Sequence, residues 1–361
     1  MIKPDKYLPK YYQLKEYLKQ MIQNGEIIPT QKLPSESELV RQFKVSRDTV
    51  RHSFSELENE GWIYREQGKG TFCAYRGSKK EQKIAVLTTY ISNYIFPYIM
   101  RGIEETLCES GFSFSIASTG NDKRKEEECM KRFLEQDISG IIVEPTKSAK
   151  PNINQKYFQE LDKRNIPYIL LHATYPDLDS AYLMMDDEKG GFLTTQHLLK
   201  LGHKDIAGIF LSDDLQGVKR QAGFLSALKK YNVSINNEFL GNYRTDQMFS
   251  YPYNFTINLL KKKNRPTAIV CYNDQIAIQV IEAIRRSNLK IPGDISLVGY
   301  DDSNLAVATE VKLTTIKHPK EEMGKRVAHM IVDMINGKVE KPFFVYQPEF
   351  ITRSSCKRFE K

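Results

Sequence analysis

Apolar residues recur at helical spacing near the start of the chain. Leu14, Leu18 and Ile22 lie four residues apart, so they share one face of a helix. Pro9 precedes this run and Asn24-Gly25 follows it, as start and stop signals do. The pattern predicts a first amphipathic helix between them.

Two shorter helices are predicted next, because each has a capping signal before its apolar residues. Ser35 and Glu38 have the spacing of a capping box, in which each side chain bonds the other residue's backbone amide. Ser46 is an N-cap candidate for a third helix, and Val50 and Phe54 face inward from it. After these helices, residues 62–72 are typical of a hairpin with a glycine-rich tip.

The inward face of the third helix leaves Arg47 and Arg51 outward, one turn apart. A helix that begins with outward arginines after a tight turn fits the recognition helix of a helix-turn-helix, which enters the DNA major groove by its first residues. Guanidinium can bond guanine O6 and N7 together. A solvated helix face is the alternative for two arginines alone, and the adjoining hairpin favours DNA.

From residue 84 onward, short apolar runs alternate with helical stretches. The runs expected as strands are 84–87, 113–117, 140–143, 168–171, 206–210, 268–271 and 296–298. Such alternation predicts an α/β fold with doubly wound parallel sheets, whose ligands bind at the carboxyl ends of the strands.

Charge is concentrated at the N-terminal end of the chain. Residues 1–80 hold 15 Lys and Arg against 10 Asp and Glu, whereas the rest hold 38 against 35. This excess fits a domain that meets DNA phosphates, although a soluble basic domain would also show it. The five cysteines are scattered, and neither a signal peptide nor a long apolar run is visible, so we expect a cytoplasmic protein without membrane contact.

Motifs for several chemistries are missing from the sequence. No G-x-G-x-x-G, G-K-[ST] or G-x-S-x-G run occurs, and the six histidines form no H-x-x-x-H pair. We therefore expect no catalytic residues, no metal site and no cofactor other than an effector ligand. Absent motifs disfavour an enzyme without excluding one.

The head resembles the winged helix-turn-helix of GntR-type regulators over about residues 8–75. The resemblance lies in LPSESEL at 33–39, VSRDTVR at 45–51 and ELENEGWIYREQGKGTF at 56–72. It implies DNA contacts at Ser37, Arg47, Arg51 and the wing tip. The full set of candidate DNA-binding residues is Lys10, Glu36, Ser37, Ser46, Arg47, Asp48, Thr49, Arg51, Gln67, Gly68 and Lys69. Glu36 and Asp48 could accept from cytosine, or could be first-turn helix charges.

The rest of the chain resembles the effector domain of LacI/GalR-type regulators. GVKRQAGF at 217–224 carries the resemblance, with Tyr272-Asn273-Asp274 and Val298–Asp302. It implies ligand contacts at Arg220, Asn273 and Asp301, whose planar groups suit sugar hydroxyls. By analogy the cleft is also lined by Tyr94, Phe96, Glu144, His172 and His318. Glu144 could instead be solvated, and His172 could be a satisfied interdomain histidine.

We expect a DNA-binding head over residues 1–76, a linker over 77–82 and an effector-binding and dimerisation domain over 83–356. The two expected lobes of the last domain are 83–184 with 319–338, and 185–316 with 340–356.

The pairing of these two parts resembles the arabinose repressors of Gram-positive bacteria, including the run VLTTYISNYIFP at 86–97. This resemblance implies a repressor of arabinose-utilisation genes that binds palindromic operator DNA as a homodimer and is released by L-arabinose. Another small polar ligand or an activating role remains an alternative, because the residues themselves indicate only a small polar effector.

Overall fold

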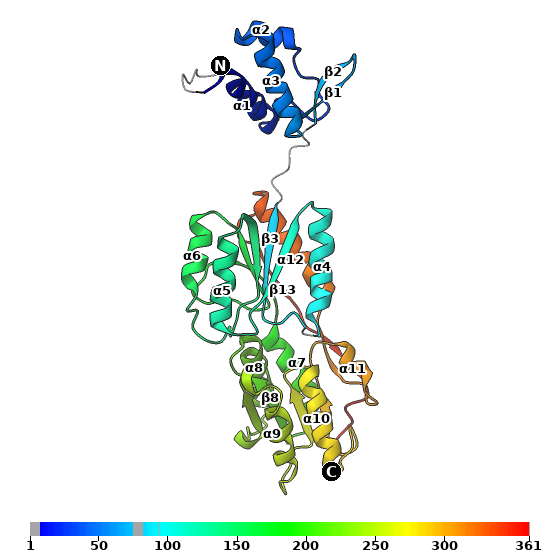
Figure 1. Cartoon of the computed structure of the whole chain (residues 1–361). Helices are drawn as coiled ribbons and strands as arrows, with labels where there is room; N and C mark the ends of the chain where they lie inside the picture. Colours follow the sequence, from blue (N-terminus) through cyan, green and yellow to red (C-terminus); the bar gives the residue numbers. More distant parts are fainter. Residues whose placement is uncertain (1–7, 75–81, 93, 361) are drawn as a thin grey trace. The chain divides into compact units, whose positions relative to one another are not determined.

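The structure, a computed structural model, describes residues 8–74, 82–92 and 94–360 (Figure 1). It forms two compact units that divide after Glu81. The greater part of the expected linker, 77–81, lies outside the described residues. Each unit has its own hydrophobic core.

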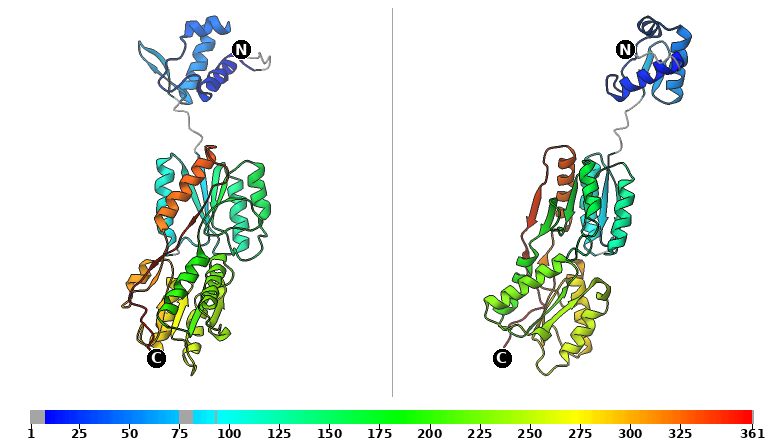
Figure 2. Two further views of the ribbon diagram at one scale, coloured as in Figure 1. Left: turned by 180° about the vertical axis from the view of Figure 1, so that it is seen from behind. Right: turned by 90° about the vertical axis from the view of Figure 1, so that its left-hand side faces the viewer.

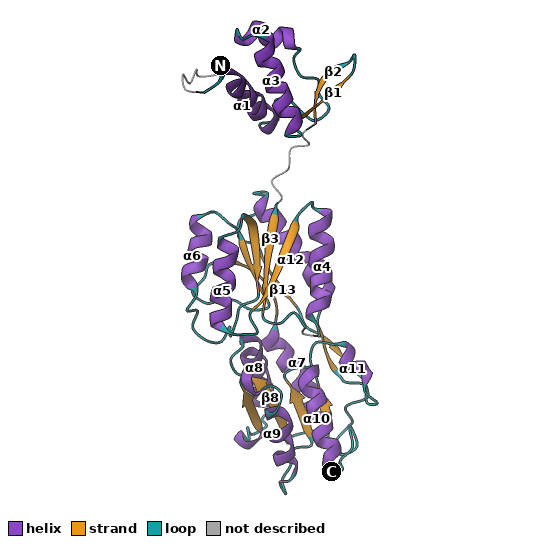
Figure 3. Cartoon of the chain, viewed as in Figure 1, coloured by secondary structure: helices purple, strands orange, loops and turns teal. Residues whose placement is uncertain are grey.

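The first unit is a three-helix head with a hairpin, as the apolar spacing predicts (Figure 3). Its helices are α1 (Lys10–Gln23), α2 (Glu36–Phe43) and α3 (Arg47–Asn59), and its antiparallel strands are β1 (Ile63–Glu66) and β2 (Gly70–Cys73). Leu14, Leu18, Val50, Phe54 and Leu57 are buried together in its core. The capping box is present, since the Ser35 hydroxyl accepts from the Glu38 amide while the Glu38 carboxylate accepts from the Ser35 amide. Ser46 caps α3 through the Thr49 amide.

The second unit contains two lobes, and a parallel six-stranded sheet forms the first. Its strand order is β13-β7-β6-β5-β3-β4. The strands are β3 (Lys83–Thr88), β4 (Ser113–Ser118), β5 (Ile138–Val143), β6 (Tyr168–Leu171), β7 (Ala181–Met185) and β13 (Phe343–Tyr346). The helices of this lobe are α4 (Phe96–Glu109), α5 (Lys123–Leu134), α6 (Gln155–Lys163) and α12 (Lys320–Ile335).

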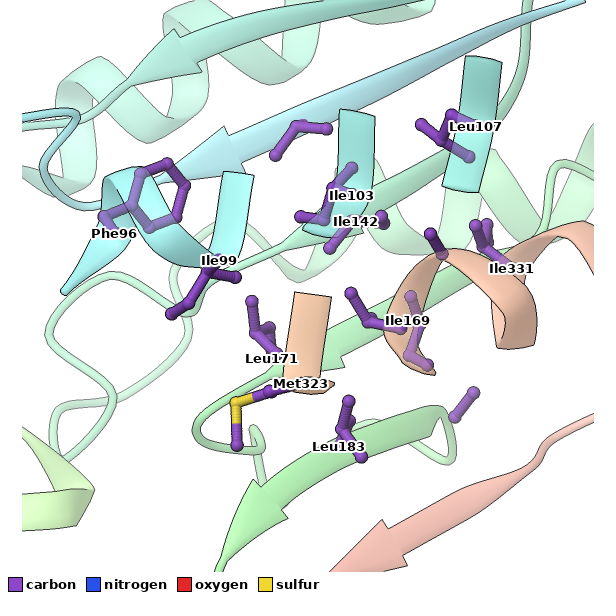
Figure 4. Packing of buried hydrophobic residues seen from close by; sticks show 14 of the residues in the cluster. Phe96, Ile99, Ile103, Leu107, Ile142, Ile169, Leu171, Leu183, Met323 and Ile331 are labelled. Atoms are coloured by element: carbon purple, nitrogen blue, oxygen red, sulfur yellow. The ribbon is translucent and has the colours of Figure 1, made fainter. Parts of the chain in front are cut away.

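Alternate residues of these strands are buried on opposite faces of the sheet, as the period of two in a strand requires. Helices α4 and α12 cover one face, where Ile142, Ile169 and Leu183 meet Ile103 and Ile331 (Figure 4). Helices α5 and α6 cover the other face (Figure 1). With both faces covered, the central strands consist almost entirely of apolar residues.

The second lobe repeats this design around a smaller sheet of order β11-β10-β8-β9. Its strands are β8 (Ile206–Leu211), β9 (Leu240–Tyr243), β10 (Ala268–Cys271) and β11 (Ser296–Val298). Helices α7 (Asp187–Lys200) and α8 (Leu215–Lys230) pack on one face, and α9 (Tyr251–Leu260) and α10 (Asp274–Arg286) on the other. Short helices η1 (Asn237–Phe239), η2 (Thr245–Gln247) and α11 (Asn304–Ala308) complete it.

The chain crosses between the lobes three times, after β7, after β12 (Thr315–Lys317) and after β13 (Figure 2). Strand β14 (Glu349–Ile351) pairs with β12 in an antiparallel pair. The C-terminal stretch divides differently from our expectation, which placed all of 340–356 in the second lobe. Strand β13 pairs in parallel with β7, so residues 343–346 belong to the first lobe. No sequence pattern indicates this strand, because an edge strand of four residues has little pattern of its own.

Candidate functional site

The exposed start of α3 lies against the start of α2, and two polar contacts join them. Arg47 Nη2 donates to Ser37 Oγ over 3.2 Å, and Arg51 Nε is 3.0 Å from a carboxylate oxygen of Glu36. The side chain of Arg51 is still 60% exposed. Both arginines therefore stand on one solvent-facing surface and are oriented by residues of α2.

The other residues predicted to contact DNA are also on the surface of the head. Lys10 begins α1, and Asp48 lies exposed in the first turn of α3. The Ser46 hydroxyl is 2.8 Å from that of Thr49, so this pair supports the helix start. At the wing tip, Gln67, Gly68 and Lys69 are exposed, and Lys69 Nζ is 2.9 Å from Glu66. Gly68 has a φ of 77°, a left-handed conformation that glycine adopts without strain.

A cavity lies between the two lobes at the carboxyl ends of their parallel strands. It holds about 70 Å³ of space, which admits on the order of five water molecules and so suits a small polar ligand. The residues that line it are Thr89, Tyr90, Ile95, Asn121, Glu144, His172, Leu211, Asp214, Gln216, Arg220, Tyr243, Thr245, Met248, Tyr272, Asn273, Gln275, Ile276 and Asp301. Five of the eight predicted ligand contacts are among them.

Arg220, on α8, is the central cation of the cavity and is almost completely buried. Its Nε donates to Asp187 over 2.8 Å and its Nη1 donates to the Tyr272 carbonyl over 2.8 Å. The guanidinium lies 3.6 Å from the centre of the Tyr300 ring, within range of a cation–π contact. Burial opposes its charge, but Asp187 and Asp301 keep the pKa of Arg220 well above its usual value. The side chain is thus a fixed hydrogen-bond donor.

The close packing of α7 against α8 sets the position of Arg220 beside the cavity. Gly191 on α7 lies so close to α8 that an added Cβ would be 2.1 Å from the carbonyl oxygen of Arg220. Such a distance leaves no room for any side chain at residue 191. The close contact between the two helices therefore depends on this glycine.

Asp301 and Asn273 contribute the other polar groups expected from the sequence. Asp301 accepts from the Tyr94 hydroxyl, and its other oxygen is 3.7 Å from Arg220 Nη2. Burial and the neighbouring Asp301 raise the pKa of Tyr94 well above its usual value, so Tyr94 stays a hydroxyl donor. The Asn273 carbonyl oxygen caps α10 through the Ile276 amide, and the amide N–H groups of Asn273 can donate to a ligand.

Glu144 follows β5 and His172 follows β6, and the two side chains meet. His172 Nδ1 is 3.0 Å from Glu144 Oε1. Burial opposes the charge of Glu144, but hydrogen bonds from His172, Thr88 and Thr89 lower its pKa to about 2. His172 has a φ of 69°, a left-handed conformation that is uncommon outside glycine.

Three predicted contacts are not among the lining residues: Tyr94, described above, Phe96 and His318. Phe96 is the first residue of α4 and packs into the core between α4 and the sheet, so the expectation that it lines the cavity is wrong (Figure 4). A phenylalanine at that position is the apolar residue that anchors the helix start. His318 is buried and lies edge-on to the His172 ring at 5.2 Å between ring centres, but it does not line the cavity.

Two aspartates, one in the cavity lining and one that holds Arg220 from behind, were not singled out from the sequence. Asp214 caps α8 through the Gln216 amide and also lies within 3.3 Å of the Tyr272 hydroxyl. Asp187 holds Arg220. Both aspartates follow an aspartate at the start of a helix, where a plain capping role explains them equally well, so the sequence carried no separate signal.

Among the described residues, no group of three or more His, Cys, Asp or Glu side chains could hold a metal ion. No helix in the described part of the chain is long and apolar enough to cross a membrane.

Comparison with known proteins bears on both units. Residues 10–73 match the family of bacterial regulatory proteins named gntR, and residues 195–356 match the periplasmic binding protein-like domain. The chain is 47% identical to the arabinose metabolism transcriptional repressor of Geobacillus stearothermophilus, over 98% of this chain and 99% of that protein. It is 43% identical to the protein of the same name from Halalkalibacterium halodurans, over 96% of each.

The second unit also resembles solved structures. A LacI family transcriptional regulator from Enterococcus faecium, with bound ribose, is similar with a TM-score of 0.66 and 27% identity. The match covers 77% of this chain and all of that one. The α/β architecture expected from the sequence, a winged helix-turn-helix head followed by a periplasmic-binding-protein-like domain, is thereby confirmed.

Proposed function

The chain belongs to the family of arabinose metabolism transcriptional repressors, and on that premise we propose that L-arabinose, bound between its lobes, releases it from operator DNA. Its relatives regulate transcription, so the chain is a repressor rather than an enzyme. A small molecule acts on such a protein as an effector, and no cofactor is needed.

The observation that supports a sugar effector best is the buried Arg220 at the interlobe cavity. Asp187 and the Tyr272 carbonyl hold its Nε and Nη1, while Nη2 remains on the side of Asp301. A sugar hydroxyl both donates and accepts, so it can bridge the guanidinium and the Asp301 carboxylate. The proposed ligand contacts are the side chains of Arg220, Asp301, Asn273 and His172. The cavity is small and has polar side chains, which favours a small sugar over a larger one.

The DNA-binding part of the proposal rests on the exposed face of α3 and the wing. Arg47 and Arg51 would read base edges in the major groove, and Lys69 would contact phosphate or the minor groove. Ser46 and Thr49 would hold the helix start, where the positive end of the helix dipole faces the DNA backbone. Lys10, Glu36, Ser37, Asp48, Gln67 and Gly68 complete the proposed contact surface.

We infer that the repressor works as a homodimer on palindromic operators. A two-fold dimer presents its recognition helices to half-sites on one face of the duplex. Closure of the lobes on the effector would then change the spacing or mobility of the two DNA-binding heads, as a two-state domain movement can.

The experiment is a titration of L-arabinose into a complex of the full chain with a labelled operator fragment. The fragment is taken from an arabinose-utilisation promoter. We expect release at sugar concentrations that calorimetry shows to be saturating, whereas D-ribose and D-glucose release it poorly. Binding of L-arabinose without release would reject the allosteric part of the proposal. Binding of another sugar in its place would reject the effector.

A further inference from the structure

Four hydrogen bonds from the protein hold the Glu144 carboxylate in place. Its Oε2 accepts three of them, each of 2.7 Å, from the Thr88 hydroxyl, the Thr89 hydroxyl and the Thr89 amide. Its Oε1 lies 3.0 Å from His172 Nδ1. These contacts fix the orientation of the carboxylate and turn Oε1 toward His172.

The same contacts decide which proton His172 carries. An ionised carboxylate can only accept, and the Glu144 carboxyl stays ionised because its pKa is held near 2. His172 Nδ1 must therefore bear a hydrogen and donate it. In the neutral ring, the proton on Nδ1 leaves Nε2 as a bare acceptor.

His172 Nε2 is also the atom that lacks a partner. His172 is only 4% exposed and lines the interlobe cavity, and its Nε2 has no hydrogen-bond partner among the described residues. A buried polar atom without a partner is costly unless something bonds to it. His172 lines the cavity, so a molecule bound there could supply this bond.

We propose that Glu144 is a positioning residue: it fixes the His172 proton on Nδ1, so that Nε2 accepts a hydrogen bond from an effector hydroxyl. This inference rests on the proposed function, because it assigns one role within the same cavity. It adds to the expectation from the sequence, in which both side chains touch the ligand. It also specifies the chemistry of the site: the effector must present a hydrogen-bond donor to His172 Nε2.

The substitution Glu144→Gln separates the two roles. Three donors face Oε2, so the amide oxygen of glutamine takes that position and its NH₂ group faces His172 Nδ1. Nδ1 must then accept, and the proton moves to Nε2. The histidine would present a donor where the parent presents an acceptor, with little change of shape.

We expect Glu144→Gln to weaken L-arabinose binding by roughly ten- to a hundred-fold, as the loss of a buried hydrogen bond does. Calorimetry at about pH 8, where histidine rings are ordinarily neutral, measures the affinity. Glu160→Gln is the matched control, because Glu160 is a surface residue paired with Arg164 and outside the cavity lining. Parental affinity in Glu144→Gln would overturn the proposal.

A double-mutant cycle with His172→Ala tests whether Glu144 acts through His172. In the His172→Ala background, Glu144→Gln should alter L-arabinose affinity by less than about two-fold, because the two changes are coupled. A direct ligand contact by Glu144 predicts additive losses instead. Additivity would therefore contradict the positioning role.

Nitrogen NMR of the free protein gives a test that needs no sugar and no variant. The ring of His172 should show its hydrogen on Nδ1 and a bare Nε2 at about pH 8. A hydrogen on Nε2 would overturn the inference. If L-arabinose failed to bind the parent chain while this tautomer was observed, the effector would be wrong and the role of Glu144 would stand.

Discussion

At the scale of single residues, the cavity contains more buried charge than a ligand alone would require. Asp187, Asp214 and Asp301 surround the one guanidinium of Arg220, and all three aspartates are at most partly exposed. Each buried carboxylate needs compensation from hydrogen bonds or from a positive charge. Their compensation is unequal, and Asp214 is the least well compensated.

Burial raises the pKa of the Asp214 carboxyl from 3.8 to about 6, although the Gln216 amide and Arg220 oppose the shift. Between about pH 4 and pH 6, the unfolded chain therefore loses this proton while the folded chain keeps it. The folded state binds more protons there, so the contribution of Asp214 to stability falls as pH rises through this window. Above it, the cost remains constant.

Asp214→Asn should therefore stabilise the protein at pH 7.5 by about 1 to 3 kcal/mol, because two pKa units correspond to about that much. Asparagine keeps the cap on the Gln216 amide, so little is lost in return. Denaturant unfolding of parent and variant at pH 7.5 and pH 4 measures the difference. The gain should vanish at pH 4, and an equal gain at both values would show that the pKa of Asp214 is not the cause.

At the scale of elements, the helices of the head are defined by local signals in the sequence. Ser35 and Ser46 cap α2 and α3, and Lys44 turns between the helices with a φ of 51°. The exposed face of α3 and the wing should contribute differently to DNA binding. Arginines at a helix start can read bases, whereas a lysine on a flexible tip contributes mainly charge.

Two substitutions should distinguish the contribution of α3 to DNA binding from that of the wing. Arg51→Ala is expected to cost roughly 1–3 kcal/mol on the operator and to relax the preference at one base pair. Lys69→Ala should weaken binding to all sequences similarly and reduce the salt slope by about one. Titrations on operator and on scrambled DNA at several salt concentrations measure both.

Lys131→Ala, in α5 of the second unit, is the control for loss of a positive charge. If Arg51→Ala bound the operator as tightly as the parent does, α3 would not be the recognition helix.

At the scale of the whole second unit, polar contacts join the lobes beside the cavity. The Ser148 hydroxyl of the first lobe accepts from the Leu215 amide of α8 over 2.9 Å and lies 3.3 Å from Asp214. Asn121 Nδ2 donates to the Thr245 hydroxyl over 2.7 Å. The three chain segments that cross between the lobes connect them in every conformation. The hydrogen bonds of Ser148 and Asn121, in contrast, exist only while the lobes are close together. They therefore stabilise the closed arrangement.

Ser148→Ala should accordingly weaken L-arabinose binding without removing any proposed ligand contact. Loss of such hydrogen bonds lowers the population of the closed state, and the apparent affinity falls with it, by roughly two- to ten-fold. Calorimetry measures the affinity, and small-angle scattering of the free protein should show a more open second unit. Ser110→Ala, at an exposed position after α4, is the control. Unchanged affinity in Ser148→Ala would mean that these contacts do not govern closure.

Most of the fold followed from the sequence, because its signals are local. Apolar spacing marked α1 and α3, the capping residues marked their starts, and the alternation of short apolar runs with helices marked both parallel sheets. For these elements, spacing along the chain is the whole signal. Arg220, Asn273 and Asp301 were instead expected from the resemblance to LacI/GalR-type regulators, and all three line the cavity.

The tertiary structure alone decided the remaining points. It placed β13 in the first lobe, buried Phe96 in the core and brought Thr88 and Thr89 to Glu144 from 56 and 55 residues away. It also joined Ser148 to Asp214, 66 residues further along. The pKa of a carboxylate and the proton position on a histidine depend on which groups surround them, and here those groups come from separate strands. Only folding brings them within hydrogen-bond distance.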